Sequence, residues 1–429
     1  MHTMSQMPYH IGFKVKLYPS DYQKHLIAVN DGAKRAVYNH LVACGNERYR
    51  LAKAVDSILL SHPAAYVPMY LERIDYLQSV SFDVKGIQNA LPFLYGKEID
   101  SLAVANAVKN YRFAWKNQKE QHRGVPMFKK KSYEQSYQTN AQYNTRKGIT
   151  TCNVRLDKDH VTLPKLERIR IGASPKIIGS LLHRTADTRI GTITIQRDAV
   201  GEYWASFAIA SDEPFHQKLE KTGSMHGIDL NLIDLINDSD GGIRENKRFY
   251  ASSQHKLAKA QHKLSRRAEH ARAEGRKLQG SVNYQTQRKK VAYLHRKIER
   301  QRTDYLHVLS KREVENQDFI AAEDLKVSNM KKNHHLAKAV SDASWRTFLT
   351  MLQYKGAFYG KTVVLIPPQY TTQTCSHCGY IMKGEEHLTL SDREWDCPNC
   401  HTHHDRDRNA AQNILNKGLQ KAKDTGLCL

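Results

Sequence analysis

The stretch Thr374–Leu415, TCSHCGYIMKGEEHLTLSDREWDCPNCHTHHDRDRNAAQNIL, is the most informative part of this chain. Its two Cys-x-x-Cys pairs are separated by 18 residues. That spacing is typical of a zinc ribbon, in which four thiolates bind one structural zinc ion. A redox pair is less favoured because two copies stand at ribbon spacing, and a disulfide because the compartment is expected to be reducing. A histidine ligand is less favoured because the four cysteines already fill the shell. The expected ligands are Cys375, Cys378, Cys397 and Cys400, and the histidines weighed as replacements are His377, His401, His403 and His404.

Acidic residues stand out in the last part of that stretch, HHDRDRNAAQNIL, where Asp405 and Asp407 lie at an expected helix start. Two further acids follow apolar strands, Asp229 in HGIDLNL and Glu323 in DFIAAEDL. Acids at adjacent strand ends form an oxygen-rich pocket that suits Mg²⁺. Two such ions can activate a water and stabilise the leaving oxygen of a phosphodiester. Any one acid alone is also explained as a helix cap or a solvated turn, the roles expected for Asp238, Asp342 and Asp392.

The chain is strongly basic, with 429 residues, a formal net charge of +23 and a sequence pI of about 9.6. Its length indicates about two to four domains, and the clustered positive charge indicates a polyanionic partner, above all nucleic acid. The N-terminal residues lack an apolar signal segment, and no long apolar run or lipidation signal favours a membrane role. Three further cysteines, Cys44, Cys152 and Cys428, are scattered along the chain. Such scatter does not resemble a disulfide framework and favours a reducing, cytoplasmic compartment.

Hydrophobic periodicity divides the N-terminal half into three parts. Residues 10–19 alternate as a strand, and a helical region runs from 22 to about 119 with breaks near Pro63, Pro68 and Pro92. Residues 139–211 have the short alternating runs and turn signals of an antiparallel β-domain, which the first strand completes.

A mixed α/β core is expected in the C-terminal half, because strands there alternate with helices. Residues 224–241 predict a buried strand and a hairpin, and 255–317 predict two long basic helices joined around Gly280. A short strand DFIAAED, a helix capped by Ser341 or Asp342, and a strand KTVVLIPP follow.

The chain resembles the TnpB family of insertion-sequence proteins and its descendants, the compact type V (Cas12-like) CRISPR effectors. The matching segments, in order, are GVPMFKKK, GIDLNL, AAEDLKVSNM, LAKAVSDASWRTFLTMLQYKGAFYGKTVVLIPPQYTTQTCSHCGY and LTLSDREWDCPNCHTHHDRDRNAAQNIL. The resemblance implies a multidomain α/β protein with an RNase H-like RuvC nuclease domain, an inserted zinc ribbon, and an N-terminal OB-like WED barrel holding a helical recognition insertion. The implied domains are residues 1–20 and 126–220 for the barrel, 21–125 for recognition, 221–368 and 403–429 for the nuclease, and 369–402 for the ribbon.

The family's catalytic acids match Asp229, Glu323 and Asp407, which the resemblance implies as ligands of two Mg²⁺ ions. Asp407 is preferred to Asp405 because the family acid stands two residues before the Asn of NAA, here Asn409. Arg393, in SDREW, matches a position from which an arginine can approach the scissile phosphate, and a structural ion pair explains it equally well. The chain departs from the family after Asp229, where Leu-Gly is usual and Leu230-Asn231 stands here.

Cationic segments are expected to line a channel for an RNA–DNA heteroduplex, which such proteins recognise by backbone shape. A solvated helical face is the alternative for the basic hairpin, and packing inside the barrel is the alternative for the two tyrosines, which could otherwise stack on bases. The candidate contacts are Lys129, Lys130, Lys131, Tyr133, Tyr137, Arg266, Arg267, Lys289, Arg296 and Arg300.

The function implied by the resemblance is RNA-guided DNA cleavage next to a short duplex motif, with guide RNA and double-stranded target DNA as partners in a bacterial or archaeal cytoplasm. Two alternatives stay open: a nuclease-inactive RNA-guided regulator, which the intact acids disfavour, and a conventional DNA transposase, which would need no guide. The sequence does not separate a transposon-associated nuclease from a CRISPR effector, or a monomer from a homodimer on one RNA.

Overall fold

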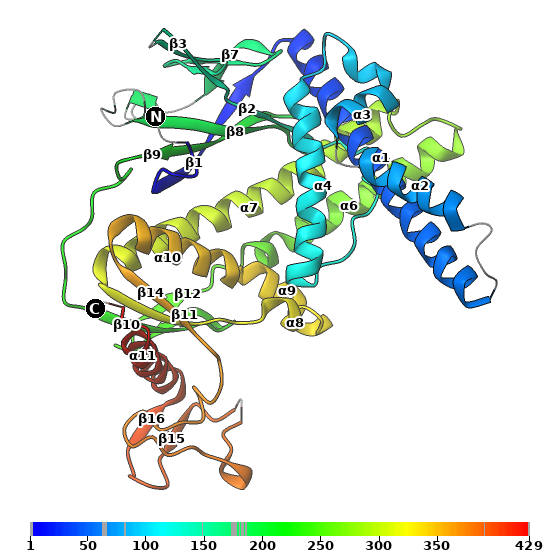
Figure 1. The fold of residues 1–429 in the computed structure, drawn as a ribbon. Helices are drawn as coiled ribbons and strands as arrows, with labels where there is room; N and C mark the ends of the chain where they lie inside the picture. Colours follow the sequence, from blue (N-terminus) through cyan, green and yellow to red (C-terminus); the bar gives the residue numbers. More distant parts are fainter. Residues whose placement is uncertain are drawn as a thin grey trace. The chain divides into compact units, whose positions relative to one another are not determined.

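The computed structural model describes residues 3–61, 67–80, 83–147, 149–172, 178, 179, 181, 184, 187–389 and 391–427. Pro63 and Cys428, both considered in the sequence analysis, lie outside these residues. The chain divides into two compact units, Met1–Phe215 and His216–Leu429 (Figure 1). In the described residues no helix combines the length and the apolar character needed to span a bilayer.

The first unit contains a seven-stranded sheet of order β2-β8-β9-β1-β7-β6-β5, in which every neighbouring pair is antiparallel. The expected β-domain is therefore present, and the N-terminal strand β1 completes it between β9 and β7. Alternating side chains of β1, β8 and β9 fill its core, among them Val15, Ile193 and Phe207. The strands are β1 Tyr9–Tyr18, β2 Gln135–Asn140, β5 Arg155–Leu156, β6 His160–Leu163, β7 Glu167–Gly172, β8 Thr188–Arg197 and β9 Tyr203–Ser211, with a separate hairpin of β3 Tyr143–Arg146 and β4 Ile149–Cys152.

Helices lie between β1 and β2 in the chain, as the apolar periodicity predicts. Pro68 falls in the first turn of α2 and Pro92 opens a 3₁₀ turn, positions that tolerate the missing N–H of proline. Asp83 and Asp100 cap α3 and α4 through their carboxylates. The helices are α1 Asp21–Ser61, α2 Val67–Val80, α3 Val84–Ala90, η1 Pro92–Tyr95 and α4 Ser101–Gln121.

The second unit is built on a five-stranded mixed sheet of order β12-β11-β10-β13-β14. The three strands β10, β13 and β14 run parallel, whereas β11 pairs antiparallel with β10 and β12 pairs antiparallel with β11. All five residues of β13 are buried, as expected for a central strand covered on both faces. The strands are β10 Met225–Asp229, β11 Asp234–Asp238, β12 Ile243–Glu245, β13 Phe319–Glu323 and β14 Thr362–Ile366.

Helices of the second unit include the predicted basic hairpin, formed by α6 Phe249–Ala273 and α7 Val282–Asn316. The helix start predicted at Ser341 or Asp342 is wrong. Helix α9, His334–Ala343, runs through both residues, and α10, Trp345–Tyr359, begins after Ser344. The Asp342 carboxylate instead accepts hydrogen bonds from Tyr250 N (2.9 Å) and Ala251 N (3.3 Å). It therefore caps α6, so this acid is a helix cap as expected, but for a helix distant in sequence.

The zinc-ribbon segment stands between β14 and the last helix, α11 Arg406–Asp424. It contains the hairpin of β15 Glu394–Asp396 and β16 His403–Asp405, and the short turn η2 Gly384–Glu386. Helix α11 packs against β10, β13, β14 and β11. The chain thus leaves the sheet, folds the ribbon, and returns directly into the helix that covers the sheet.

Candidate active site and metal centre

The four predicted cysteines come together in the ribbon, with all four Sγ atoms within 4.8 Å of one another. Sγ of Cys375 lies 3.7 Å from that of Cys400, and Sγ of Cys378 lies 3.6 Å from that of Cys397. A tetrahedral zinc ion with bonds of about 2.3 Å needs sulfurs about 3.8 Å apart, which these two distances match. None of the described cysteines forms a disulfide.

Two residues support the sulfurs from outside the set. His404 Nε2 lies 3.1 Å from Cys375 Sγ while its ring packs on Trp395 at a centroid distance of 4.6 Å. The Asn399 amide donates to Cys378 Sγ, and this hydrogen bond is the main reason that the pKa of Cys378 falls to about 6. A lowered pKa favours the thiolate that zinc requires. Both residues therefore act on cysteines, and neither replaces one.

Asp229 and Glu323 end adjacent parallel strands, β10 and β13, as the sequence predicts. Burial, then the nearby carboxylates of Glu323 and Asp407, raise the pKa of Asp229 to about 7. Burial also raises the pKa of Glu323, against a hydrogen bond of 2.6 Å from Thr371 Oγ1. The acids are thus close enough to repel one another, although no three acids of the described residues bring their oxygens within 4.8 Å.

Asp407 reaches these two acids because α11 approaches the sheet unusually closely. A Cβ placed on Gly227 of β10 would lie 1.9 Å from the Ala411 carbonyl oxygen, and one on Gly418 would lie 2.4 Å from the Ala321 Cβ. Glycine at both contacts lets helix and strand backbones nearly touch. The NAA motif also joins α11 to the ribbon, because Asn409 accepts from Ser376 N and donates to the Thr374 carbonyl, both at 2.8 Å.

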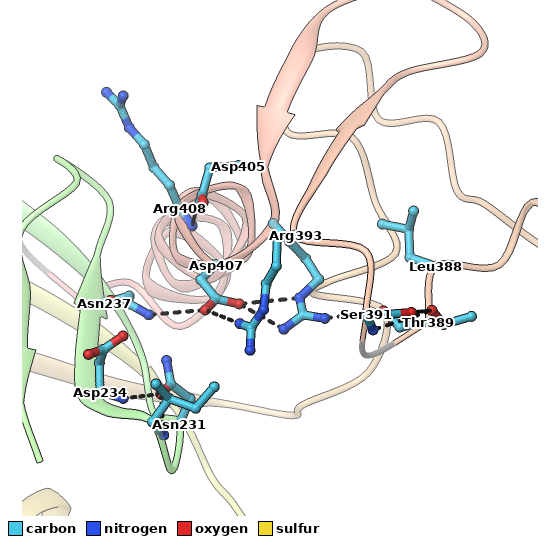
Figure 2. A network of polar contacts seen from close by, with 12 residues as sticks. Asn231, Asp234, Asn237, Leu388, Thr389, Ser391, Arg393, Asp405, Asp407 and Arg408 are labelled. Carbon is cyan, nitrogen blue, oxygen red and sulfur yellow. Dashed lines mark hydrogen bonds and ion pairs between the residues drawn. The ribbon is translucent and has the colours of Figure 1, made fainter.

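The Asp407 carboxylate is held by cations and one amide (Figure 2). Arg406 donates to Oδ1 through Nε and a terminal nitrogen, both at 3.2 Å. Oδ2 accepts from Arg393 and from Asn237 Nδ2, again at 3.2 Å each. Arg393 therefore makes the ion pair that was one of its two predicted roles. Its side chain stays 49% exposed, so it can also face a phosphate outside.

Asp405 and Asn231 have local roles next to the acids. Asp405 caps α11 by accepting from Arg408 N at 2.8 Å, and it points away from the Asp407 network (Figure 2). The Asn231 Oδ1 accepts from Ile233 N and Asp234 N, at 3.0 and 2.8 Å, and builds the turn between β10 and β11. The departure from Leu-Gly thus keeps the tight turn, and the Asn231 amide also works to lower the pKa of Asp229.

The donors of this second site are three carboxylates, which suit a divalent cation that prefers oxygen ligands. The two buried ones, Asp229 and Glu323, have raised pKa values, and a bound cation would lower them again. Two arginines pair with Asp407, the buried Arg406 and the half-exposed Arg393.

Asp392 is a turn acid as expected and accepts from Thr389 N at 2.7 Å. Asp238 also accepts within a turn, from Gly242 N at 2.7 Å, but it is 3% exposed and pairs with Arg244, so it is not the solvated acid expected.

The residues predicted to contact nucleic acid differ in how exposed their side chains are. Tyr137 is fully buried in the β-sheet core, so its prediction as a stacking platform is wrong, and it packs the sheet instead. Tyr133 is 37% exposed. Lys129 lies over the Tyr38 ring at 3.7 Å and, with Lys130, lines a cleft of about 470 Å³ in the first unit. The remaining candidates are exposed or half-buried side chains: Lys131 before β2, Arg266 and Arg267 on α6, and Lys289, Arg296 and Arg300 on α7.

Five residues of these sites were missed by the sequence reasoning. Arg406 carried a signal, because it stands beside Asp407 in DRDRNAA. The others depend on strand register or loop path, which no local pattern reveals. They are Asn237, Thr371, Asn399 and Asn409, the last noticed only as a motif marker.

Three family models match successive parts of the chain. They are described as the Cas12f1-like TNB domain at residues 345–414, "Probable transposase" at 206–334 and a helix-turn-helix domain at 7–53. The last of these covers strand β1 and one uninterrupted part of α1, so the matched residues do not form two helices joined by a turn.

Whole-chain relatives extend these matches. A "Putative RNA-guided DNA endonuclease" of Streptomyces pristinaespiralis is 30% identical over 95% of this chain and 89% of its own length. The "Putative RNA-guided DNA endonuclease InsQ" of Escherichia coli K12 is 27% identical over 95% and 92%. A solved Cas12f1–sgRNA–target DNA complex has a protein chain of 12% identity and TM-score 0.45, matching 95% of this chain and 98% of that one.

Proposed function

We propose that this chain, which belongs to the TnpB family of RNA-guided DNA endonucleases, cuts DNA with Asp229, Glu323 and Asp407 under the direction of a bound guide RNA. The observation that carries the proposal is the convergence of three acids from β10, β13 and α11 on one buried site. Burying like charges together is costly and gives no packing benefit, so such a cluster is a functional arrangement rather than a structural one.

Divalent metal ions, when bound by these carboxylates, would activate a water and stabilise the leaving oxygen of a phosphodiester. The chain's own residues prepare that site. Thr371 orients Glu323 by its 2.6 Å hydrogen bond, and Arg406 and Asn237 hold the two oxygens of Asp407. Arg393, half-exposed on the ribbon, is placed to meet a phosphate as it approaches Asp407.

The zinc ribbon has a supporting role in this proposal. Its four cysteines would hold one zinc ion and no substrate, because a closed tetrahedral shell leaves no open position. Zinc would fix the ribbon, and the ribbon would fix Arg393 and the start of α11. Loss of zinc would therefore weaken cutting by displacing Arg393 and the start of α11, because the zinc ion itself takes no part in the reaction.

The rest of the chain would hold the nucleic acids. In this proposal the β-sheet unit is a WED barrel with α1–α4 as the recognition insertion, and it binds guide RNA and the duplex next to the target. The exposed cations of the α6–α7 hairpin contact phosphates of the heteroduplex. A cytoplasmic location follows from these partners.

Alanine substitution tests the catalytic assignment. Asp229→Ala and Asp407→Ala should each lower the cleavage rate of guide-matched DNA by at least about a thousandfold while target binding is kept. Asp405→Ala is the matched control, because its carboxylate caps α11 and points away from the site, and it should keep cutting. Cutting by Asp229→Ala at the wild-type rate would overturn the assignment.

Guidance by RNA is tested separately. RNA that co-purifies with the full chain should be a defined non-coding transcript, and removing it with ribonuclease should abolish target-specific cutting. Cutting that is specific for transposon ends without any RNA would instead support the conventional transposase.

A further inference from the structure

Strand register places Asn237 in line with two of the catalytic acids. Asp229 of β10 pairs directly with Asn237 of antiparallel β11, and directly opposed residues project from the same face of a sheet. On the other side, Ile228 pairs with Ala322 of parallel β13, so one residue further along both strands Asp229 stands beside Glu323. Asn237, Asp229 and Glu323 thus form one polar row across three adjacent strands.

The amide of Asn237 is only half used. The residue is 6% exposed, and its Nδ2 donates to Asp407 Oδ2 at 3.2 Å (Figure 2). Its Oδ1 is buried without a hydrogen-bond partner among the described residues. A buried acceptor left unpaired is destabilising, and native proteins rarely tolerate one without a reason.

Two other buried asparagines, Asn30 and Asn409, have both ends of the amide paired. Asn30 donates to the Leu26 carbonyl and accepts from Asp100 N, and Asn409 likewise donates and accepts across the ribbon junction. Asn237 differs because its spare atom is an oxygen, the donor type that Mg²⁺ and Mn²⁺ prefer, beside three carboxylates.

We propose that Asn237 is a fourth member of the metal site, in which Oδ1 is an oxygen donor to the divalent cation, directly or through one water, and Nδ2 positions Asp407. The inference rests on the proposed function, since it requires the three acids to bind a cation. The acids alone supply negative charge. Asn237 adds a neutral oxygen, which strengthens coordination without adding to the repulsion between the acids.

Mn²⁺ binding to the zinc-loaded full chain tests this inference, with free Mn²⁺ followed by electron paramagnetic resonance. Asn237→Leu removes the oxygen and should weaken Mn²⁺ binding by about tenfold or more. Asn237→Asp keeps an oxygen and should bind within a few-fold of the wild type. Asn30→Leu, at a buried asparagine of the other unit, is the matched control, and it should lower thermal stability without changing Mn²⁺ affinity.

The outcomes separate this inference from the proposed function. If Asp229→Ala binds Mn²⁺ as well as the wild type, the metal site itself is wrong. If Asp229→Ala loses binding but Asn237→Leu keeps it, the metal site stands and the role of Asn237 is overturned. Equal losses in Asn237→Leu and Asn237→Asp would likewise overturn the oxygen-donor role. Thermal unfolding of the zinc-loaded chain without added Mn²⁺ shows that each variant is folded before its binding is compared.

Discussion

The ribbon and the five-stranded sheet hold two sites of opposite character, one of four cysteine sulfurs and one of three carboxylates. The sulfurs lie within 4.8 Å of one another, at spacings that already suit zinc. The carboxylates are spaced more widely, and an arginine pair and two neutral side chains hold them. Thiols can be neutral until a metal arrives, whereas carboxylates at neutral pH repel one another.

This difference indicates that the two sites relate oppositely to stability. The ribbon is a small segment with a small core, so a bound zinc ion would supply much of its folding free energy. The carboxylate site sits on a large packed sheet that folds despite the acids. Metal ligands should therefore stabilise the fold in the ribbon and destabilise it in the sheet, and four measurements address that contrast.

Removing a zinc ligand should have the largest effect. Cys397→Ser exchanges a fully buried sulfur of the set for a hydroxyl, and we expect loss of bound zinc and unfolding of the ribbon, because structural zinc contributes on the order of 10 kcal/mol to such segments. Zinc content and proteolysis at 375–405 measure it. Cys152→Ser, at a half-buried cysteine outside the set, is the control. Full zinc occupancy in Cys397→Ser would show that the ribbon does not depend on this ligand for its metal.

Filling the close contact of β10 and α11 should have the next largest effect. Gly227→Val places side-chain atoms against the Ala411 carbonyl, and we expect a loss of about 3 kcal/mol or more in unfolding free energy, because a backbone neighbour cannot move aside. Gly12→Ala, where a Cβ meets nothing within 4 Å, should be tolerated. Chemical denaturation checks both variants. An unchanged midpoint for Gly227→Val would show that α11 does not depend on this contact.

Neutralising an acid should stabilise the sheet. Asp229→Asn removes a buried charge next to Glu323 and Asp407, so in the zinc-loaded chain without added Mg²⁺ or Mn²⁺ at pH 8 we expect the free energy of unfolding to rise by about 0.5–2 kcal/mol while cleavage is lost. Differential scanning calorimetry measures the change. A lower melting temperature than the wild type would mean that Asp229 stabilises the fold, as a zinc ligand does.

The smallest effect should be a pH dependence of strand β10. Burial alone lowers the pKa of His226, but the carboxylates of Glu313, 3.5 Å away, and of Asp240, at 3.0 Å, outweigh it, and the net pKa is raised above 6.5. Nearby Asp238 also raises this pKa, and Arg244 pairs with Glu313. The stabilisation is therefore complete below about pH 6.5 and is lost as pH rises through the raised pKa.

Melting temperatures between pH 5.5 and 8.5 test this dependence. The decline should flatten in His226→Gln and persist in His295→Gln, at an exposed histidine of α7. Equal slopes in wild type and His226→Gln would assign the pH dependence to other groups.

Local patterns sufficed for the parts of the sites that are local. The two Cys-x-x-Cys pairs and the acids at strand ends are visible in short segments, as are the strands that carry them. Asn237 could not be found this way, because its role depends on the register of β11 against β10. Thr371 reaches Glu323 only through the path of the loop after β14.

Tyr137 and Asp342 are two residues whose places in the fold were predicted wrongly from local patterns. Tyr137 lies among polar residues in QSYQTN, so the sequence does not reveal that its face of β2 is the buried one. Asp342 looks like the start of its own helix, and only tertiary packing brings the N-terminus of α6 to its carboxylate. In both cases tertiary packing decides the role of the side chain: Tyr137 lies in a strand that begins before the expected β-domain, and Asp342 lies inside α9 rather than at the start of α10.

The ribbon enters and leaves the nuclease fold at a single place, the first turns of α11. Asn409 and Asn413 bind the incoming chain at Thr374 and Ser376, and the outgoing chain is held where Arg406 N donates to the Arg393 carbonyl. An insertion with one fixed stem is an exchangeable module. Its length and tip can change during evolution, or in an engineered graft, without disturbing the sheet, provided that the stem and the helix keep these bonds.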